Sequence, residues 1–163
     1  MPVVPFETLP DQARVWVFGS DAPLTGERKD TLLKGVDAHL DDWKAHGAPL
    51  TVGREWRDDH FLVVAVDQST AGASGCSIDG LYRTLQQLEA ETGAKMVSGG
   101  RVFFRNGAGQ VQSASRAEIA DLAGKGELSR DSVVFDTTLT DLGTFRECFE
   151  RPAKQSWVAE LLP

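Results

Sequence analysis

The residues best suited to chemistry in this 163-residue chain lie in one small and polar segment, residues 67–79. The segment follows an apolar run and leads into a helical pattern, and Cys76 lies where that helix is predicted to begin. A thiol at a helix N-terminus feels the positive end of the helix dipole, which favours the thiolate. Cys76 is therefore a candidate nucleophile.

His46 is the predicted partner of Cys76. Gly47 and Pro49 are expected to end the first helix, which would put His46 at its C-terminus, on the same rim of the molecule as Cys76. A histidine at a helix C-terminus is favoured as the cation, and an imidazolium stabilises a nearby thiolate. The pair predicts a cysteine-dependent transferase or hydrolase, with Cys76 as nucleophile and His46 as base.

The same segment also predicts the binding of a small anionic ligand without catalysis, because backbone N–H groups at a helix N-terminus bind carboxylates and phosphates. Arg14 is expected nearby and would add positive charge, while Asp67 either orients Arg14 or caps the turn that follows it. The predicted ligand-binding residues are Arg14, Asp67, Ser74, Gly75, Ser77, Ile78 and Asp79. In a purely structural alternative, Cys76 is buried and the small residues only let strand and helix pack closely.

The remaining histidines and cysteine have structural interpretations. His39 is expected to pack in a half-buried position, and Cys148 to pack within an apolar, helix-like stretch. His60 is expected in a hairpin at the opposite end of the sheet. His39 and His46 are seven residues apart with no third ligand nearby, so neither a metal nor a cofactor is predicted. Two cysteines are too few for a disulfide framework, which favours reduced thiols.

The elements that position these residues follow from the apolar patterns. The predicted elements are strands at 13–19, 50–57, 61–66 and 101–105, and helices from Thr25 to about 47 and from about 77 to Gly93. This order matches the ferredoxin-like split βαβ sandwich, an α+β fold with an antiparallel sheet and two helices on one face. The uniformly apolar run 61–66 predicts a central strand, and 50–57 an edge strand.

A C-terminal extension, residues 106–163, is predicted to pack on a ferredoxin-like core of residues 1–105 in one compact unit. Its expected features are a turn at Asn106-Gly107, a capping box from Ser115 to Glu118 that opens a short helix, a strand at 133–135, and packing of Phe145, Phe149 and Trp157.

Composition excludes several classes of protein. The formal net charge is −7 and lysine and arginine do not cluster, so affinity for nucleic acid or an anionic membrane is not expected. The chain has no apolar run of about 18 residues and does not begin with the pattern of a secretion signal. We expect a cytoplasmic protein.

Four segments, residues 13–18, 43–47, 73–79 and 152–157, carry a resemblance that spans nearly the whole chain. Together they resemble a family of small uncharacterised bacterial proteins that automated annotation often labels "ABC transporter ATPase". A phosphate-binding P-loop needs a glycine, four residues, then Gly-Lys-Ser or Gly-Lys-Thr, and residues 72–77 contain no lysine. ATPase activity is therefore not expected.

A second resemblance covers residues 101–136. This resemblance rests on seven residues: Ser115, Glu118, Leu122, Gly126, Leu128, Asp131 and Val134. They resemble the hairpin-plus-helix pattern of GYF-like domains, which implies peptide binding. The third class of function is thus a protein-interaction module, acting through these residues or as a homodimer through an exposed sheet face. It predicts an exposed apolar patch centred on Phe103, Phe104 or Phe135.

Overall fold

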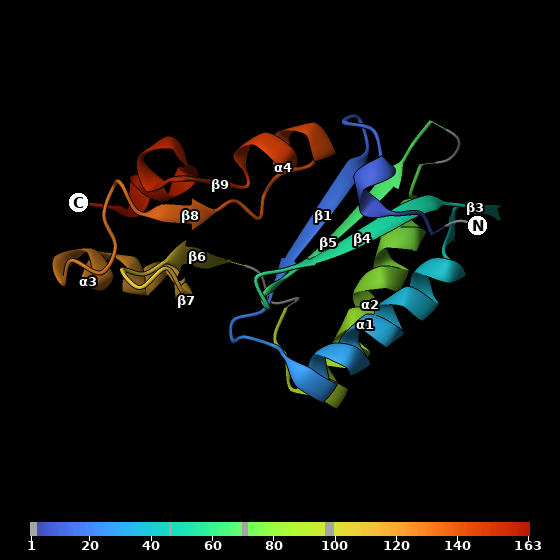
Figure 1. Cartoon of the computed structure of the whole chain (residues 1–163), viewed down its shortest axis with the longest axis horizontal. Coiled ribbons are helices and arrows are strands. Elements are labelled where there is room, and N and C mark those ends of the chain that lie inside the picture. The colour runs from blue at the N-terminus through green and yellow to red at the C-terminus, as the bar shows by residue number, and fades with distance from the viewer. Residues whose placement is uncertain (1–2, 46, 70–71, 97–99) are drawn as a thin grey trace.

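The computed structural model describes residues 3–45, 47–69, 72–96 and 100–163, and these form an α+β protein with antiparallel sheets. The first sheet has the strand order β1-β5-β4 and consists of β1 (Arg14–Gly19), β4 (Thr51–Arg57) and β5 (Phe61–Asp67). The long helices α1 (Gly26–Asp41) and α2 (Gly75–Thr92) cover one face of this sheet (Figure 1).

Strand β5 is the centre of the first sheet, as its continuous apolar sequence predicts. Phe61 to Val66 are fully buried, because helices cover one face and aromatic side chains the other. β1 pairs with β5 from Arg14 opposite Val66 to Gly19 opposite Phe61, and β4 forms the far edge. The predicted hairpin is also confirmed, with Asp58 and Asp59 at positive φ angles of 54° and 57°.

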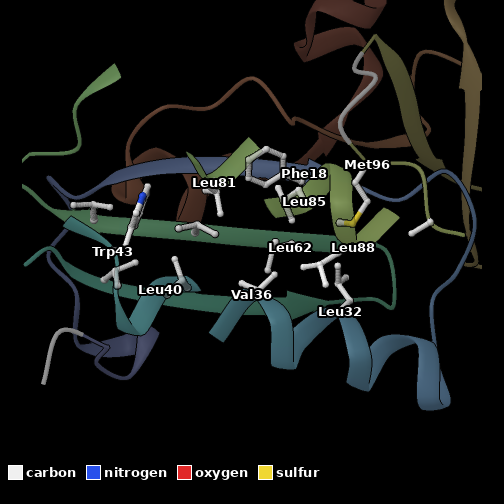
Figure 2. Close-up of a cluster of buried hydrophobic side chains, with 14 of the residues drawn as sticks. Phe18, Leu32, Val36, Leu40, Trp43, Leu62, Leu81, Leu85, Leu88 and Met96 are labelled. Carbon is white, nitrogen blue, oxygen red and sulfur yellow. The ribbon is translucent and has the colours of Figure 1, made fainter. Parts of the chain in front are cut away.

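The face under the helices forms one hydrophobic core. The contributing side chains are Leu32, Val36 and Leu40 of α1, Leu81, Leu85 and Leu88 of α2, and Phe18 and Leu62 of the sheet (Figure 2). Their spacing of three or four residues puts each helical set on a single face. Helix α2 has its predicted end, because Gly93 takes a left-handed conformation with φ 76°.

Helix α1 ends earlier than the sequence predicts. Its last residue is Asp41, and the short strands β2 (Lys44–Ala45) and β3 (Ala48–Pro49) pair beyond it. Trp43 continues the apolar spacing but lies outside the helix, where it is 4% exposed. The prediction that the helix runs to Gly47 is therefore wrong, and His46 lies outside the described residues. Trp43 matches the apolar spacing of α1 although it lies after the helix, because it packs against the start of α2.

The strand at residues 101–105 belongs to a second sheet. This sheet has the order β7-β6-β8-β9 and consists of β6 (Arg101–Arg105), β7 (Val111–Ser115), β8 (Val133–Phe135) and β9 (Glu150–Pro152). The prediction that this strand completes the first sheet is wrong. The C-terminal segment contacts the free edge of β1 instead, since Val15 N–H donates to Thr140 O at 3.0 Å. The predicted boundary at 105/106 falls between the paired strands β6 and β7.

Two further clusters hold the C-terminal half in place. The first joins the two sheets and contains Phe61, Phe103, Phe135, Phe145 and Phe149. The second lies on the outer face of the second sheet and includes Ile119 of α3 (Ile119–Gly124) and Val158, with Trp157 packed against it. Helix α4 (Leu142–Cys148) carries Phe145 into the inter-sheet cluster, so the predicted packing of the C-terminal aromatic residues is confirmed.

Local signals in this half also agree with the structure. Ser115 N–H donates to Glu118 Oε1 at 2.9 Å, which confirms the capping box. The predicted exposed apolar patch is wrong, because Phe103, Phe104 and Phe135 are only 4%, 3% and 4% exposed. They lie on both faces of a sheet that is covered on both sides. Among the described residues, no helix is both long and apolar enough to span a bilayer.

Candidate functional site

Ser74 and Ser77 build the start of helix α2. Ser74 is the N-cap, and its Oγ accepts a hydrogen bond from Ser77 N–H at 3.1 Å. The Ser77 hydroxyl donates to Lys44 O at 2.6 Å, and the two Oγ atoms are 2.8 Å apart. Because the Ser77 proton is used by Lys44 O, the Ser74 hydroxyl is the donor between the two serines. The helix start is thereby tied to the segment that follows α1.

Trp43 makes the second connection between these segments. Its Nε1–H donates a buried 2.7 Å hydrogen bond to Ser77 O. The indole also packs edge-on against Trp16, with ring centroids 6.2 Å apart. Trp43 thus closes one end of the helix core, while Met96 lies at the other end (Figure 2).

A surface hollow of about 460 Å³ lies over this junction. It is lined by Asp42, Trp43, Lys44, Ser74, Cys76, Ser77 and Gly80. Cys76 is a free, exposed thiol, which excludes the alternative that it is a buried packing residue. Lys44 is exposed and is the cationic residue of the lining. The structure therefore brings Ser74, Cys76 and Ser77 together, with Lys44 as a neighbour that the sequence did not indicate.

The N–H groups at the helix start differ from the predicted set. Ser77 N–H is used by Ser74 Oγ, and Ile78 N–H donates to Ser74 O at 3.0 Å. The prediction that these two groups bind an anion is wrong, because the N-cap already satisfies them. Gly75 and Cys76 are the first two helical residues, and their N–H groups have no acceptor among the described residues.

Arg14 and Asp67 do not line the hollow. Asp67 Oδ1 accepts from Ser69 N–H at 2.9 Å, and this backbone hydrogen bond holds the pKa of Asp67 below its usual range. The interpretation that Asp67 caps the following turn is therefore confirmed. The Arg14 guanidinium lies 5.2 Å from the centroid of the Trp16 ring. Ile78 packs against the core, and Asp79 is exposed.

His39 has the packing role that the sequence predicts. Its Nδ1 lies 3.0 Å from Thr84 Oγ1, which links α1 to α2, and its ring centroid is 6.0 Å from that of Trp43. Its Nε2 is buried and has no hydrogen-bond partner in the described part of the chain. Burial lowers the pKa of His39, and the charge of Asp42 opposes this effect.

Within the ranges that the structure describes, no three histidine, cysteine, aspartate or glutamate side chains are grouped to hold a metal ion.

The fold and the hollow define an α+β protein with an exposed cysteine in the first turn of a long helix. Comparisons with protein-family models, curated proteins and solved structures found no match to this chain. The family resemblance noted from the sequence therefore stays a prediction.

Proposed function

We propose that the protein binds a small anionic ligand, a carboxylate or a phosphate, in the hollow at the start of α2. The observation that carries the proposal is the pair of N–H groups of Gly75 and Cys76, which have no acceptor among the described residues and begin an 18-residue helix beside Lys44. A helix N-terminus carries a partial positive charge, and an ammonium group adds a full one.

The hollow is preorganised for such a ligand. The bonds from Trp43 Nε1 and Ser77 Oγ hold the backbone of Lys44 against the first turn of α2 before any ligand arrives. A site that is rigid before binding loses less conformational entropy when it is occupied. Asp42 also lines the hollow, which favours a ligand with a hydroxyl or amine beside its anionic group.

Replacing Gly75 by proline tests the role of the backbone donor. Gly75 is the first helical residue, a Cβ there meets no atom within 4 Å, and Ser74 is extended with ψ 167°, so the helix accepts proline. Gly75→Pro deletes one N–H group and should weaken phosphate binding by about two- to fivefold in calorimetry. Gly75→Ala keeps the N–H group and is the matched control. Equal affinities for the two variants would contradict the proposal.

Lys44→Ala tests the side-chain charge. It removes the ammonium group but keeps the carbonyl that accepts from Ser77, so the helix junction should survive. The expected loss of phosphate affinity is about two- to fivefold. Lys34→Ala removes another exposed charge, on α1 and outside the hollow, and should leave the affinity unchanged. A matching loss in both variants would mean that only the overall charge matters.

A second candidate function is a thiol-dependent transferase or hydrolase. It is favoured by the exposure of Cys76 at the edge of the hollow. In a Cys148→Ser background, iodoacetamide should alkylate Cys76 rapidly already at about pH 6 if the helix start stabilises the thiolate. A rate that rises steeply throughout the range up to about pH 8.5 would rule out an activated nucleophile.

We also infer that β1, α1, β4, β5 and α2 are a ferredoxin-like sandwich without its fourth strand. The order β1-β5-β4 supports this inference, because a split βαβ unit places its third strand between the first and the second. The free thiols of Cys76 and Cys148 support a reducing compartment such as the cytoplasm.

A further inference from the structure

The sequence contains a single asparagine, Asn106, and a glycine follows it. The two residues lie where the hairpin of β6 and β7 turns, just beyond the pair formed by Arg105 and Val111 (Figure 1). An asparagine side chain can react with the backbone nitrogen of the next residue, and glycine obstructs this approach least because it has no Cβ. The dipeptide therefore holds an amide carbon and a nitrogen nucleophile next to each other.

The backbone nitrogen of Gly107 is available as this nucleophile. Gly107 is exposed, and its N–H has no acceptor among the described residues. The bonds that close the turn use other groups, since Asn106 N–H donates to Gln110 O and Gly109 N–H donates to Asn106 O, both at 2.9 Å. The Gly107 N–H can therefore lose its proton to solvent without breaking a bond of the hairpin.

The side-chain carbonyl of Asn106 is polarised by the turn. Its Oδ1 accepts from Ala108 N–H and from Gln110 N–H, each at 3.0 Å. When a nitrogen attacks Cγ, negative charge develops on this oxygen, and two fixed N–H donors stabilise such charge as an oxyanion hole does. Within the described chain, Nδ2 donates one long bond of 3.4 Å to Gln110 Oε1, so the leaving group is held weakly.

A second dipeptide shows how the fold can withhold the nucleophile. Asp79-Gly80 can form the same cyclic imide, but Gly80 lies in the second turn of α2. A helical N–H donates to the carbonyl oxygen four residues earlier, so it is not free to lose its proton. The structure thus engages the nitrogen at Gly80 and leaves it available at Gly107.

We propose that Asn106 is a site of spontaneous deamidation in the folded protein, with the Gly107 nitrogen as nucleophile. Hydroxide removes the Gly107 N–H proton, the nitrogen bonds to Asn106 Cγ, and the charge moves to Oδ1. The Cγ–Nδ2 bond then breaks, and Nδ2 takes a proton from water and leaves as ammonia, which forms a succinimide ring and regenerates hydroxide. Water opens the ring at either carbonyl and gives an aspartyl or an isoaspartyl product.

The reaction changes the hairpin in two ways. A carboxylate replaces a neutral amide, which adds one negative charge to the formal net charge of −7. The isoaspartyl product also lengthens the main chain by one carbon before the nitrogen of Gly107. The turn bonds between Asn106 and Gln110, and the 3.0 Å bond from Arg105 to Gly109 O, depend on the original chain length. The isoaspartyl form should therefore loosen the ends of β6 and β7. The site is independent of the anion site proposed at α2.

Mass spectrometry of the intact protein follows the reaction. Incubation at about pH 8 should produce a gain of about 1 Da, as an amide becomes a carboxylic acid. Peptide mapping should place this gain at position 106, and ion-exchange chromatography should separate a more acidic species. The rate should rise with pH, because the first step is the loss of an N–H proton. Isoaspartate should accumulate at position 106 and not at Asp79.

Gly107→Ala tests the nucleophile. A Cβ at Gly107 meets no atom within 4 Å, and its φ is not positive, so the hairpin accepts alanine. The methyl group obstructs the attack and should slow deamidation about tenfold or more. Gly124→Ala is the matched control, because it is an equally open glycine outside the hairpin and should leave the rate unchanged. Equal rates in the wild type and in Gly107→Ala would overturn the proposal, since water would then hydrolyse the amide directly.

The unfolded chain shows what the fold contributes. The wild type is incubated in buffer and in guanidinium chloride at the same pH, and the two rates of mass gain are compared. The folded protein should deamidate at least as fast as the unfolded chain, because the turn leaves the Gly107 N–H free and supplies two donors to Oδ1. A slower rate in the folded protein would overturn the proposal, since the turn would then protect Asn106.

Discussion

The indole Nε1–H of Trp43 donates to the carbonyl oxygen of Ser77 at 2.7 Å, across 34 residues of sequence. The bond joins the segment after α1 to the first turn of α2, and both residues line the hollow in which an anion is proposed to bind. It makes the position of Lys44 depend on the packing of the two helices.

Trp43→Phe tests this relationship. Phenylalanine keeps an aromatic ring against Trp16 but removes the N–H donor, so a buried interaction is lost. The free energy of unfolding should fall by about 1–2 kcal/mol in urea denaturation. Phosphate affinity should fall as well, because Lys44 is held less firmly. The comparison variant Trp157→Phe, in a different cluster, should leave phosphate affinity unchanged.

Phe61 is predicted to couple the stabilities of the two sheets. Its ring lies within 5.1 Å of Phe103, 4.8 Å of Phe135 and 5.1 Å of Phe149, measured between ring centroids. Phe61→Ala should reduce the free energy of unfolding by about 3–5 kcal/mol. Hydrogen exchange should accelerate in both β5 and β6. Faster exchange in β5 alone would show that the second sheet is stable by itself.

Gly19 of β1 is needed because the Phe103 ring of β6 packs directly against its backbone. A Cβ at this position would lie 2.4 Å from the Phe103 Cζ atom. This distance is a steric clash, so the Phe103 ring would have to move. Gly19→Ala should destabilise the protein by about 1–3 kcal/mol. Gly107→Ala is the control, since a Cβ there meets no atom within 4 Å. Thermal melting of the two variants gives the comparison.

His39 should make stability depend on pH. Its pKa in the folded protein lies below the ordinary value of 6.5, chiefly because of burial. The unfolded chain therefore binds the proton first as the pH falls through 6.5, and protonation stabilises the unfolded state. The stability that neutral His39 contributes to the folded protein is fully present above pH 6.5 and is lost as the pH falls toward the lowered pKa.

The measurement is urea denaturation of the wild type and of His39→Gln between about pH 7.5 and 5.5. The wild type should lose more stability over this interval, because the other titrating groups are common to both proteins. A parallel decline in the two proteins would show that His39 keeps an ordinary pKa when folded.

Features determined by neighbouring residues could be predicted from the sequence. The run Phe61 to Val66 is apolar at every position, which is typical of a strand covered on both faces, and β5 is such a strand. The end of α2 at Gly93 and the capping box at Ser115 depend on short-range backbone chemistry, and both predictions are confirmed. The end of α1 differs from its prediction, because an apolar period does not show whether its last member, Trp43, is still helical.

By itself, the sequence determined that Cys76 lies in the first turn of a helix, since the cap, the apolar stripe and the closing glycine are all local. Tertiary structure alone decided that β6 joins a second sheet, that Lys44 lies beside Cys76, and that His60 and Asp21 line one hollow. These contacts join residues far apart in the chain. They depend on how two helices and two sheets pack, which no pattern within one segment specifies.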